Sequence, residues 1–477
     1  MSMTDAPTTP AGRWPRQIKY IIVNEACERF SYYGMTGILA GYVSGKIAAG
    51  GLGQTEDYTT TVTQLFIFVN YFTPLLGAWL SDKFIGRYKT IFWVSLFYCA
   101  GHGTLACSDF FGEHGKMICL YVGLTLIAFG SGGIKPCVSA FMGEQFRPDQ
   151  SHLMQKAYGA FYWAINFGSF FSFLVVPWVK DHHGYSPAFA VPGILMAIAT
   201  FIFWRGKRFY IIVPTNREKQ HAGFFKVFFT ALVAKREPGQ TFWEAAGTKF
   251  TANEIAAARS VFPILFVFAT IPMFWALYNQ TNSTWVMQGL KMSDVIILGL
   301  KVGAEQMQSL NPVLIMLFVP IFTLFFYPRM GRFASPLKRM SYGLFLAAAA
   351  FVLIALLEKR LEAGEHLSIL WQTWPYVVVT AAEVLVSTTG LEFAFREAAP
   401  EMKSLIMSFW LLTIAVGSLL VALITQFLPH AGPHADDASV SSGRFMLYAG
   451  MMFGVAILFS LIASTYHYRD KAAAQGK

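Results

Sequence analysis

The segment from Lys19 to Ile47, KYIIVNEACERFSYYGMTGILAGYVSGKI, is long and apolar enough to cross a lipid bilayer, yet it carries three charged residues near its middle. A hydrocarbon core of ~30 Å requires about 20 residues of helix, because backbone polar groups in lipid must bond to one another. The apolar run lacks the small-residue cleavage site of a removed signal peptide. We therefore expect a membrane helix that is retained and not cleaved off, and a protein with such a helix is an integral membrane protein.

The three charges share one face of this predicted helix. At about 100° per residue, Glu25, Glu28 and Arg29 lie in the same sector as Tyr32 and Thr36. Each charge would cost ~3 kcal/mol or more at the centre of a membrane helix if it stayed unpaired, so this face must point into the protein. Two interpretations remain open. The face is a site for a proton or a substrate, or it is a structural ion pair between Glu25 and Arg29 that leaves Glu28 surplus.

The composition agrees with a membrane protein. Hydrophobic residues make up 55% of the 477 residues and charged residues only 13%, against roughly a quarter in soluble domains. This charge is too sparse to cover the surfaces of soluble domains. Aromatic residues at 16%, without any Gly or Pro period, exclude low-complexity disorder and fibrous repeats.

Twelve apolar stretches have the length of membrane helices. They cover residues 19–47, 61–81, 89–109, 116–142, 155–179, 187–204, 260–282, 308–328, 336–357, 371–396, 401–428 and 443–467. The sequence therefore predicts an all-α, polytopic membrane protein with 12 transmembrane helices in two six-helix bundles. Its predicted parts are a cytoplasmic N-terminal tail (1–18), an N-terminal bundle (19–204), a cytoplasmic linker (205–259), a C-terminal bundle (260–467) and a cytoplasmic C-terminal tail (468–477).

The formal charge of +10 is explained by this topology. If the N-terminus is cytoplasmic, most Lys and Arg residues fall on the cytoplasmic side of the predicted helices, as the positive-inside rule requires. Both termini are then cytoplasmic, and a nucleic-acid partner is unnecessary. Within the linker, residues 224–234 and 243–250 could lie along the membrane surface.

A lysine lies deep in the fourth apolar stretch, in the sequence FGSGGIKPCVSAF of residues 129–141. The glycines allow another helix or a ligand to approach closely, and Pro136 frees backbone groups that a cavity could use. The ammonium of Lys135 needs an anion, either a glutamate of the first helix or a carboxylate that arrives from outside. The alternative is a lysine that snorkels to the interface, but apolar residues flank Lys135 on both sides.

The tenth stretch carries the opposite charge at mid-membrane depth. Glu383 lies eight residues after Pro375 and belongs to the second bundle, whereas Lys135 belongs to the first. A pocket with a cation on one side and an anion on the other complements a zwitterion. If they share that cavity, hydrogen bonds and apolar walls would come from Tyr32, Tyr33, Tyr71, Asn166, Trp275, Asn311 and Trp410.

The motifs of several other protein classes are missing from the sequence. It contains no Walker loop, Gly-x-Ser-x-Gly elbow or His-Glu-x-x-His motif, which disfavours ATP-driven pumping and intramembrane hydrolysis. No zinc-like spacing of Cys and His is present, and we predict no metal, no cofactor and no catalytic residue. Cys107 and Cys119 flank one outer loop and could form a disulfide, while His102 is expected to bond a neighbouring carbonyl group.

Several motifs together resemble the proton-coupled oligopeptide transporter family of the major facilitator superfamily, and a bacterial member of it. They are Glu25-x-x-Glu28-Arg29-Phe30-x-Tyr32-Tyr33, residues 129–141, residues 274–280 (FWALYNQ), residues 308–312 (QSLNP) and residues 383–393, with a charged loop at residues 77–89 that resembles one of the superfamily. The resemblance implies the superfamily fold and a symporter, not an enzyme, that imports di- and tripeptides with protons. It would be a multi-pass monomer of the inner membrane.

The resemblance also implies roles for individual residues. Lys135 and Arg29 would bind the peptide C-terminus, and its amino end would face Glu383, Asn166 and Asn311. The side-chain pockets would be formed by Tyr32, Tyr33, Tyr71, Trp275 and Trp410. Proton coupling would involve Glu25, Glu28, Arg29 and Lys135. Thr36, Gln64 and Asn279 depart from the family pattern, and Asn279 stands where many members carry an acidic residue, which shifts coupling onto the first helix.

We expect the coupling to work by competition for Lys135. A peptide carboxylate that binds this lysine deprives a glutamate of the first helix of its cation, and the glutamate then takes a proton. The alternative substrate within the same family is a non-peptide anion such as nitrate, although a lone anion gains nothing from Glu383. A membrane sensor or scaffold would not need opposite charges in the middle of two bundles.

Overall fold

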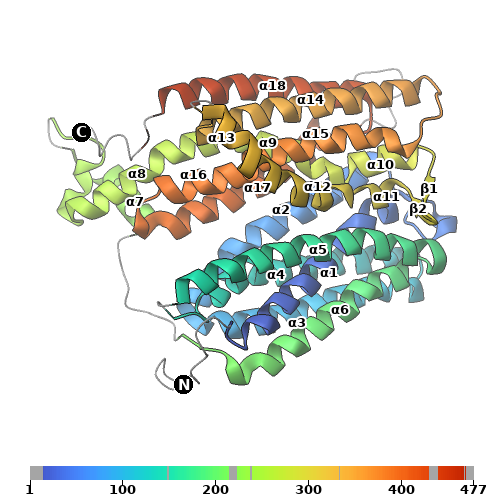
Figure 1. The fold of residues 1–477 in the computed structure, drawn as a ribbon, viewed down its shortest axis with the longest axis horizontal. Coiled ribbons are helices and arrows are strands. Elements are labelled where there is room, and N and C mark those ends of the chain that lie inside the picture. The colour runs from blue at the N-terminus through green and yellow to red at the C-terminus, as the bar shows by residue number, and fades with distance from the viewer. Residues whose placement is uncertain are drawn as a thin grey trace.

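The computed structural model describes residues 14–147, 150–213, 223–236, 239–331, 334–428, 439–466 and 468. These residues form an almost entirely helical protein of two helix bundles (Figure 1). Most of the two predicted tails and part of the predicted linker lie outside the described residues.

Six long helices form the N-terminal bundle. They are α1 (Ile18–Ser44), α2 (Glu56–Leu80), α3 (Arg87–Ala106), α4 (Glu113–Gly143), α5 (Ser151–His183) and α6 (Tyr185–Gly206). In the bundle, α1 packs against α5 and α6, and α3 packs against α4 and α6. Each helix begins and ends within about five residues of an apolar stretch in the sequence.

The C-terminal bundle combines continuous helices with interrupted ones. The continuous helices are α14 (Pro336–Glu362), α17 (Lys403–Phe427) and α18 (Ser442–Thr465). The interrupted ones are built from α8 (Ala252–Phe268), α9 (Ile271–Tyr278) and α10 (Thr284–Leu290), from α11 (Ala304–Met307), α12 (Leu310–Ile321) and α13 (Tyr327–Met330), and from α15 (Thr373–Glu383) and α16 (Thr389–Glu397). A short antiparallel hairpin, β1 (Val295–Ile297) and β2 (Leu300–Val302), connects α10 to α11.

The interruptions have local causes. A bend of 45° separates α8 from the α9–α10 segment, and α9 begins at a proline-containing turn. Proline lacks an N–H group and cannot continue the hydrogen-bond ladder of the helix before it. A π-turn, Val384–Thr388, joins α15 to α16 directly after Glu383. Such turns are frequent at functional sites, so this one marks the tenth predicted span as a candidate.

The described helices confirm a polytopic membrane protein. Nine helices among the described residues are long and apolar enough to cross a membrane, or ten if the bent pair counts as one span. The helices α1 and α3 are not among them, and α1 carries Glu25, Glu28 and Arg29. The number of twelve spans therefore stays a prediction.

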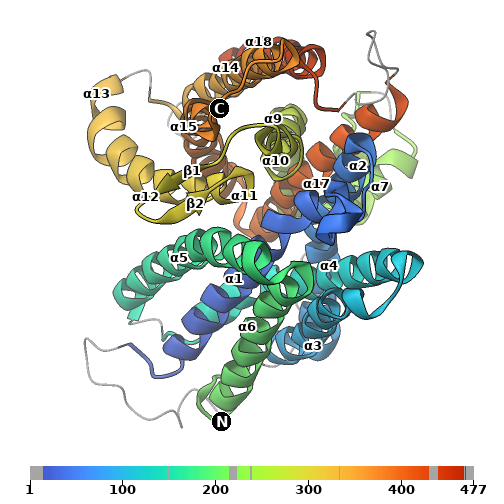
Figure 2. The ribbon, with the colours of Figure 1, turned by 90° about the vertical axis from the view of Figure 1, so that its right-hand side faces the viewer.

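The two bundles meet along α2 and α17 and along α5 and α12. Figure 2, turned by 90°, places α14 and α18 on one side of the molecule and α3 and α6 on the other, with α1, α2 and α17 near the boundary. The linker contributes one amphipathic helix, α7 (Phe224–Val233), which packs against α8 and a short helical turn, Glu244–Thr248. Both linker segments predicted from the sequence thus contain helical structure.

Two statements about single residues can be checked. Cys107 and Cys119 are free thiols, so the possible disulfide between them is not formed, whereas the expectation for His102 is wrong. His102 is fully buried, but neither ring nitrogen has a hydrogen-bond partner, and the ring stacks on Tyr98 at 5.1 Å between centroids. The ring contact with Tyr98 therefore takes the place of the expected hydrogen bond to a carbonyl group.

Candidate functional site

Arg29 is the centre of a buried charge cluster on α1. Its Nε lies 2.7 Å from Glu25 Oε1 and 3.0 Å from Glu28 Oε2. Both carboxylates are almost completely buried, at 2% and 0% exposure. The expectation that Glu28 is surplus is therefore wrong, because one guanidinium group pairs with two glutamates. Glu28 also accepts a hydrogen bond of 3.3 Å from Ser131 of α4, which ties the cluster to the helix that carries Lys135.

Among the described residues Lys135 forms no ion pair. Its Nζ lies 4.1 Å from the ring centroid of Tyr32 and 4.3 Å from that of Tyr71, and it has no hydrogen-bond partner in the same part of the chain. A glutamate of the first helix, one of the two expected partners, is thus not paired with it, and two aromatic faces, which attract cations, lie beside it instead. Because cation–π contacts do not satisfy the donors of an ammonium, Lys135 keeps its hydrogen-bonding capacity for a ligand.

Glycines allow this arrangement by bringing α2 and α4 together. A Cβ atom added at Gly77 of α2 would lie 2.7 Å from the Cα atom of Gly133 on α4. Gly77 therefore tolerates no side chain without a shift of the backbone, and a Cβ atom at Gly133 would lie 2.8 Å from the side chain of Val94 on α3. The close approach places Tyr71 of α2 against Lys135 of α4, as the glycine-rich sequence around Lys135 led us to expect.

Glu383 ends α15 in the other bundle and is held by amide and hydroxyl groups. Its Oε2 accepts a hydrogen bond of 2.7 Å from Nδ2 of Asn311, and the same nitrogen lies 3.2 Å from the hydroxyl of Thr380. The carbonyl oxygen of the Asn311 side chain accepts a hydrogen bond of 3.3 Å from Tyr278. Among the described residues no ion pair to Glu383 is found, so this carboxyl group, like Lys135, lacks an opposite charge.

A chamber lies between the two bundles, and the predicted residues that line it are Tyr32, Tyr33, Tyr71 and Asn311. Lys135 contacts the wall through the two tyrosine rings, and Glu383 contacts it through Asn311. The chamber offers about 50 Å³ to water. This is room for a few water molecules at ~10–15 Å³ each, so a peptide requires a wider conformation of the same chamber.

Besides Arg29, Lys135 and Glu383, three other predicted substrate-binding residues are absent from the chamber wall. Asn166 donates a hydrogen bond of 3.0 Å to the carbonyl oxygen of Tyr162 on its own helix. Trp275 and Trp410 pack edge to face at 6.3 Å in the core of the C-terminal bundle. Trp275 also packs edge to face on Tyr278, which does line the chamber. Their roles in substrate binding stay predictions.

Sequence reasoning missed other residues of the wall. These are Ile67, Phe173, Tyr278, Asn279, Thr281, Asn282, Gln308 and Tyr376. Tyr278 and Asn279 lie in the FWALYNQ motif, and Gln308 lies in the QSLNP motif. Both motifs therefore indicated this region, but only Trp275 and Asn311 were predicted from them to bind the substrate. Asn279 donates a hydrogen bond of 2.7 Å to Ser418, so its amide group is already bonded within the C-terminal bundle.

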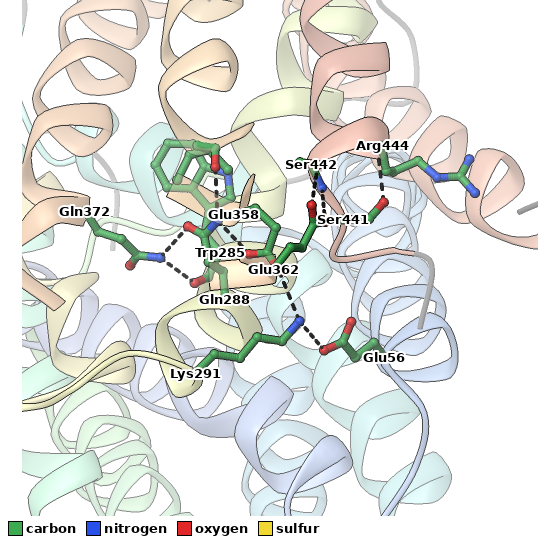
Figure 3. Close-up of polar contacts among 11 residues, drawn as sticks. Glu56, Trp285, Gln288, Lys291, Glu358, Glu362, Gln372, Ser441, Ser442 and Arg444 are labelled. Carbon is green, nitrogen blue, oxygen red and sulfur yellow. Dashed lines mark hydrogen bonds and ion pairs between the residues drawn. The ribbon is translucent and has the colours of Figure 1, made fainter. Parts of the chain in front are cut away.

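Ion pairs join the two bundles at the end of the molecule that the charge distribution assigns to the outside. Lys291, after α10, lies 3.0 Å from Glu56 of α2 and 3.2 Å from Glu358 of α14 (Figure 3). Burial lowers the pKa of Lys291, but the charges of Glu358 and Glu56 outweigh it and raise the pKa above its ordinary value. Lys291 is therefore a charged link between the bundles.

A second link lies at the same end. Lys180 of α5 pairs with Glu305 of α11 at 2.6 Å, and Lys301 of β2 lies 3.5 Å from Asp181. Glu305 is almost fully buried, so this contact is shielded from solvent. Glu305 thus lies at the junction of the two bundles.

Comparison with known proteins identifies relatives of the chain. A family model described as "PTR2: POT family" matches residues 88–435. The Drosophila melanogaster protein "Peptide transporter family 1" is 27% identical, over 98% of this chain and 90% of its own. Solute carrier family 15 member 2 of Rattus norvegicus is 36% identical over 74% of this chain, and the match spans about half of that relative's length. A crystal structure of an auto inhibited POT family peptide transporter is 36% identical, with a TM-score of 0.86 over 95% of this chain and 98% of its own.

Proposed function

The chain belongs to the POT family, and we propose that it is a proton-coupled symporter that imports di- and tripeptides by alternating access. Family membership makes it a membrane transporter and not an enzyme. The observation that carries the finer proposal is the unpaired ammonium of Lys135 in one bundle, with the unpaired carboxyl group of Glu383 in the other and one chamber between them.

The peptide C-terminus binds at Lys135 and Arg29 in this proposal. Lys135 supports it because its ammonium has no hydrogen-bond partner among the described residues and lies on the two tyrosines that line the chamber. A peptide carboxylate would supply the missing acceptor. Arg29 is at present engaged by Glu25 and Glu28 and would have to share its donors with the ligand.

The amino end of the peptide binds at Glu383. Asn311 positions this carboxyl group with a hydrogen bond of 2.7 Å and is itself part of the chamber wall. An ammonium group at this point would supply the opposite charge that Glu383 lacks. Since the two charges belong to different bundles, a bound peptide would bridge the bundles and favour a conformation in which they close around it.

Proton coupling rests on Glu25 and Glu28. In the present conformation these carboxylates pair with Arg29 and not with Lys135. We therefore infer that the peptide carboxylate competes with the glutamates for the guanidinium group as well as for the lysine. When a peptide carboxylate draws Arg29 and Lys135 toward the chamber, one glutamate is left buried without its cation. A proton then removes the cost of that charge. One elementary charge moving across ~100 mV supplies ~2.3 kcal/mol for peptide accumulation.

Alternating access requires that the two ends of the chamber open in turn. The links from Lys291 to Glu56 and from Lys180 to Glu305 hold the bundles together at the predicted outer end. We infer that these links break when the carrier opens to the outside. The proposed location is the inner membrane, with both termini in the cytoplasm, and the proposed active form is a monomer.

A carrier of a non-peptide anion such as nitrate is the weaker alternative. An anion would find Lys135, but the carboxyl group of Glu383 on the opposite side would repel it. Uptake into liposomes tests the choice. A proton gradient should drive accumulation of labelled dialanine, and unlabelled di- and tripeptides should compete for it while nitrate should not. Uptake that nitrate blocks and dipeptides leave unchanged would overturn the proposal.

A further inference from the structure

A second concave site lies on the surface of the N-terminal bundle, between α3 and α6. It is a groove of about 500 Å³, formed by the turn before α3, the first two turns of α3, the end of α6 and the chain that follows it. Figure 1 places these helix ends at the same end of the molecule as the linker helix α7. By the charge distribution, this is the cytoplasmic end, so the groove lies at the inner edge of the membrane.

The groove is basic. Lys89 and Lys207 line it, both lysines are exposed, and no carboxylate is among its lining residues. Among the described residues neither lysine forms an ion pair, and the Nζ atom of Lys207 lies 5.7 Å from the ring centroid of Tyr88. Two charged groups in one concave site without a counter-ion from the protein indicate an anionic occupant.

The remaining wall is apolar and aromatic. Trp93 of α3 is 56% exposed and Trp204 of α6 is 49% exposed, and Ile212 after α6 is 48% exposed. Tryptophan is typical of the membrane–water interface, where its ring meets both headgroups and acyl chains. A soluble anion would leave these rings uncovered, whereas a lipid covers them.

We propose that this groove binds an anionic phospholipid of the cytoplasmic leaflet. The headgroup phosphate lies between Lys89 and Lys207, and one acyl chain follows the apolar wall formed by Trp93 and Trp204. A zwitterionic lipid binds more weakly, because its positive end finds no carboxylate in the groove. The site is independent of the chamber, since none of its residues lines both.

Native mass spectrometry of the purified full-length protein tests this assignment. Phosphatidylglycerol and phosphatidylcholine with identical acyl chains are titrated onto the wild type and onto the double variant Lys89→Gln/Lys207→Gln. The control, Lys226→Gln/Lys249→Gln, removes two exposed lysines of the linker with the same change of charge. Gel filtration of each variant establishes that it is folded.

The wild type and the control should bind one phosphatidylglycerol tightly, and phosphatidylcholine at least about tenfold more weakly. The Lys89→Gln/Lys207→Gln variant should lose about 30-fold in affinity for phosphatidylglycerol, because each basic residue near an anionic lipid contributes a factor of about five. Equal binding of the two lipids, or an unchanged affinity of this variant, would overturn the proposal. Displacement of the lipid by equimolar glycerol phosphate would do the same, because the groove would then recognise a phosphate and not a lipid.

Discussion

The ammonium group of Lys135 lies 4.1 Å from the ring centroid of Tyr32, and this contact occupies the place of the anion that a membrane-buried lysine requires. A second ring, that of Tyr71, lies 4.3 Å away. The two ring contacts thus stabilise the buried ammonium group of Lys135 but do not supply it with an opposite charge. The account of substrate binding follows from this, because a carboxylate that enters the chamber finds an ammonium group with free donors.

The first prediction concerns the ring of Tyr32. Tyr32→Phe should keep the KM for dialanine within about threefold of the wild type, because the aromatic face remains. Tyr32→Leu should raise the KM about 30-fold, since a desolvated cation–π contact contributes ~2 kcal/mol or more. Uptake into proteoliposomes measures both values. If Tyr32→Phe raised the KM as much as Tyr32→Leu, the hydroxyl group and not the ring would be the important part of this side chain.

The second prediction separates the two ends of the peptide. Glu383→Gln should weaken binding of dialanine by at least about tenfold, because the substituted amide cannot pair with an ammonium group. Binding of N-acetyl-dialanine, which has no ammonium group, should change by less than about threefold. Competition against labelled substrate gives both inhibition constants. If both ligands lost affinity equally, Glu383 would be a structural residue and not the partner of the amino end.

The third prediction concerns Glu28, which shares Arg29 with Glu25. Glu28→Gln should lose proton-driven accumulation of dialanine but keep exchange of labelled for unlabelled peptide, because exchange needs no net movement of protons. The two assays use the same liposomes, with and without a pH gradient. Normal accumulation by Glu28→Gln would remove this residue from the coupling step.

The fourth prediction concerns the link from Lys291 to Glu56 and Glu358 (Figure 3). Lys291→Gln leaves two carboxylates without their cation and should favour opening of the outer end. Thr60 is buried at this junction and bonds to Ser439, so a cysteine in its place reports on opening. Its labelling by a membrane-impermeant thiol reagent, in a background without Cys107, should rise about fivefold, since Lys291 is 37% exposed and an exposed ion pair contributes at most about 1 kcal/mol.

The same link gives a prediction about pH. The pKa of Lys291 is raised above its ordinary value of 10.5, because Glu358 and Glu56 outweigh the effect of burial. A raised pKa means that the contribution of this cation is fully present below the ordinary pKa and is lost only as the pH rises through the folded-state value. Labelling of the cysteine at position 60 in the otherwise unchanged carrier, divided at each pH by the labelling rate of free glutathione, should therefore stay constant between about pH 7 and pH 9. A rise within that range would mean that another group controls the outer end.

The fold and the positions of the charged residues could be predicted from the sequence, but their pairings could not. Helix length and apolar composition are local properties, and they placed the helices of the N-terminal bundle to within about five residues, whereas the segment from α8 to α10 extends eight residues beyond the predicted span 260–282 at each end. The inward face of α1 also followed from periodicity alone. Which donor meets which acceptor depends on how helices pack, and for that reason the structure places two rings from α1 and α2 beside Lys135 where a glutamate of α1 was one of the two expected partners.

The wall of the chamber shows the same limit. Trp275 stands in the FWALYNQ motif, yet in this conformation it packs on Trp410, and Tyr278, one turn away from Trp275, lines the chamber instead. A position in a motif does not say which of its side chains faces the cavity. The outer links could not be predicted, because Lys291 and Glu56 are far apart in sequence and meet only across the junction of the bundles.

The most direct test of the central claim is proton-driven uptake of labelled dialanine by the wild type and by Lys135→Gln, reconstituted at equal density in the same liposomes. The wild type should accumulate the peptide above its external concentration and lose it when a protonophore is added. The Lys135→Gln variant should show no accumulation and no saturable binding of dialanine. Accumulation by this variant equal to that of the wild type would contradict the account.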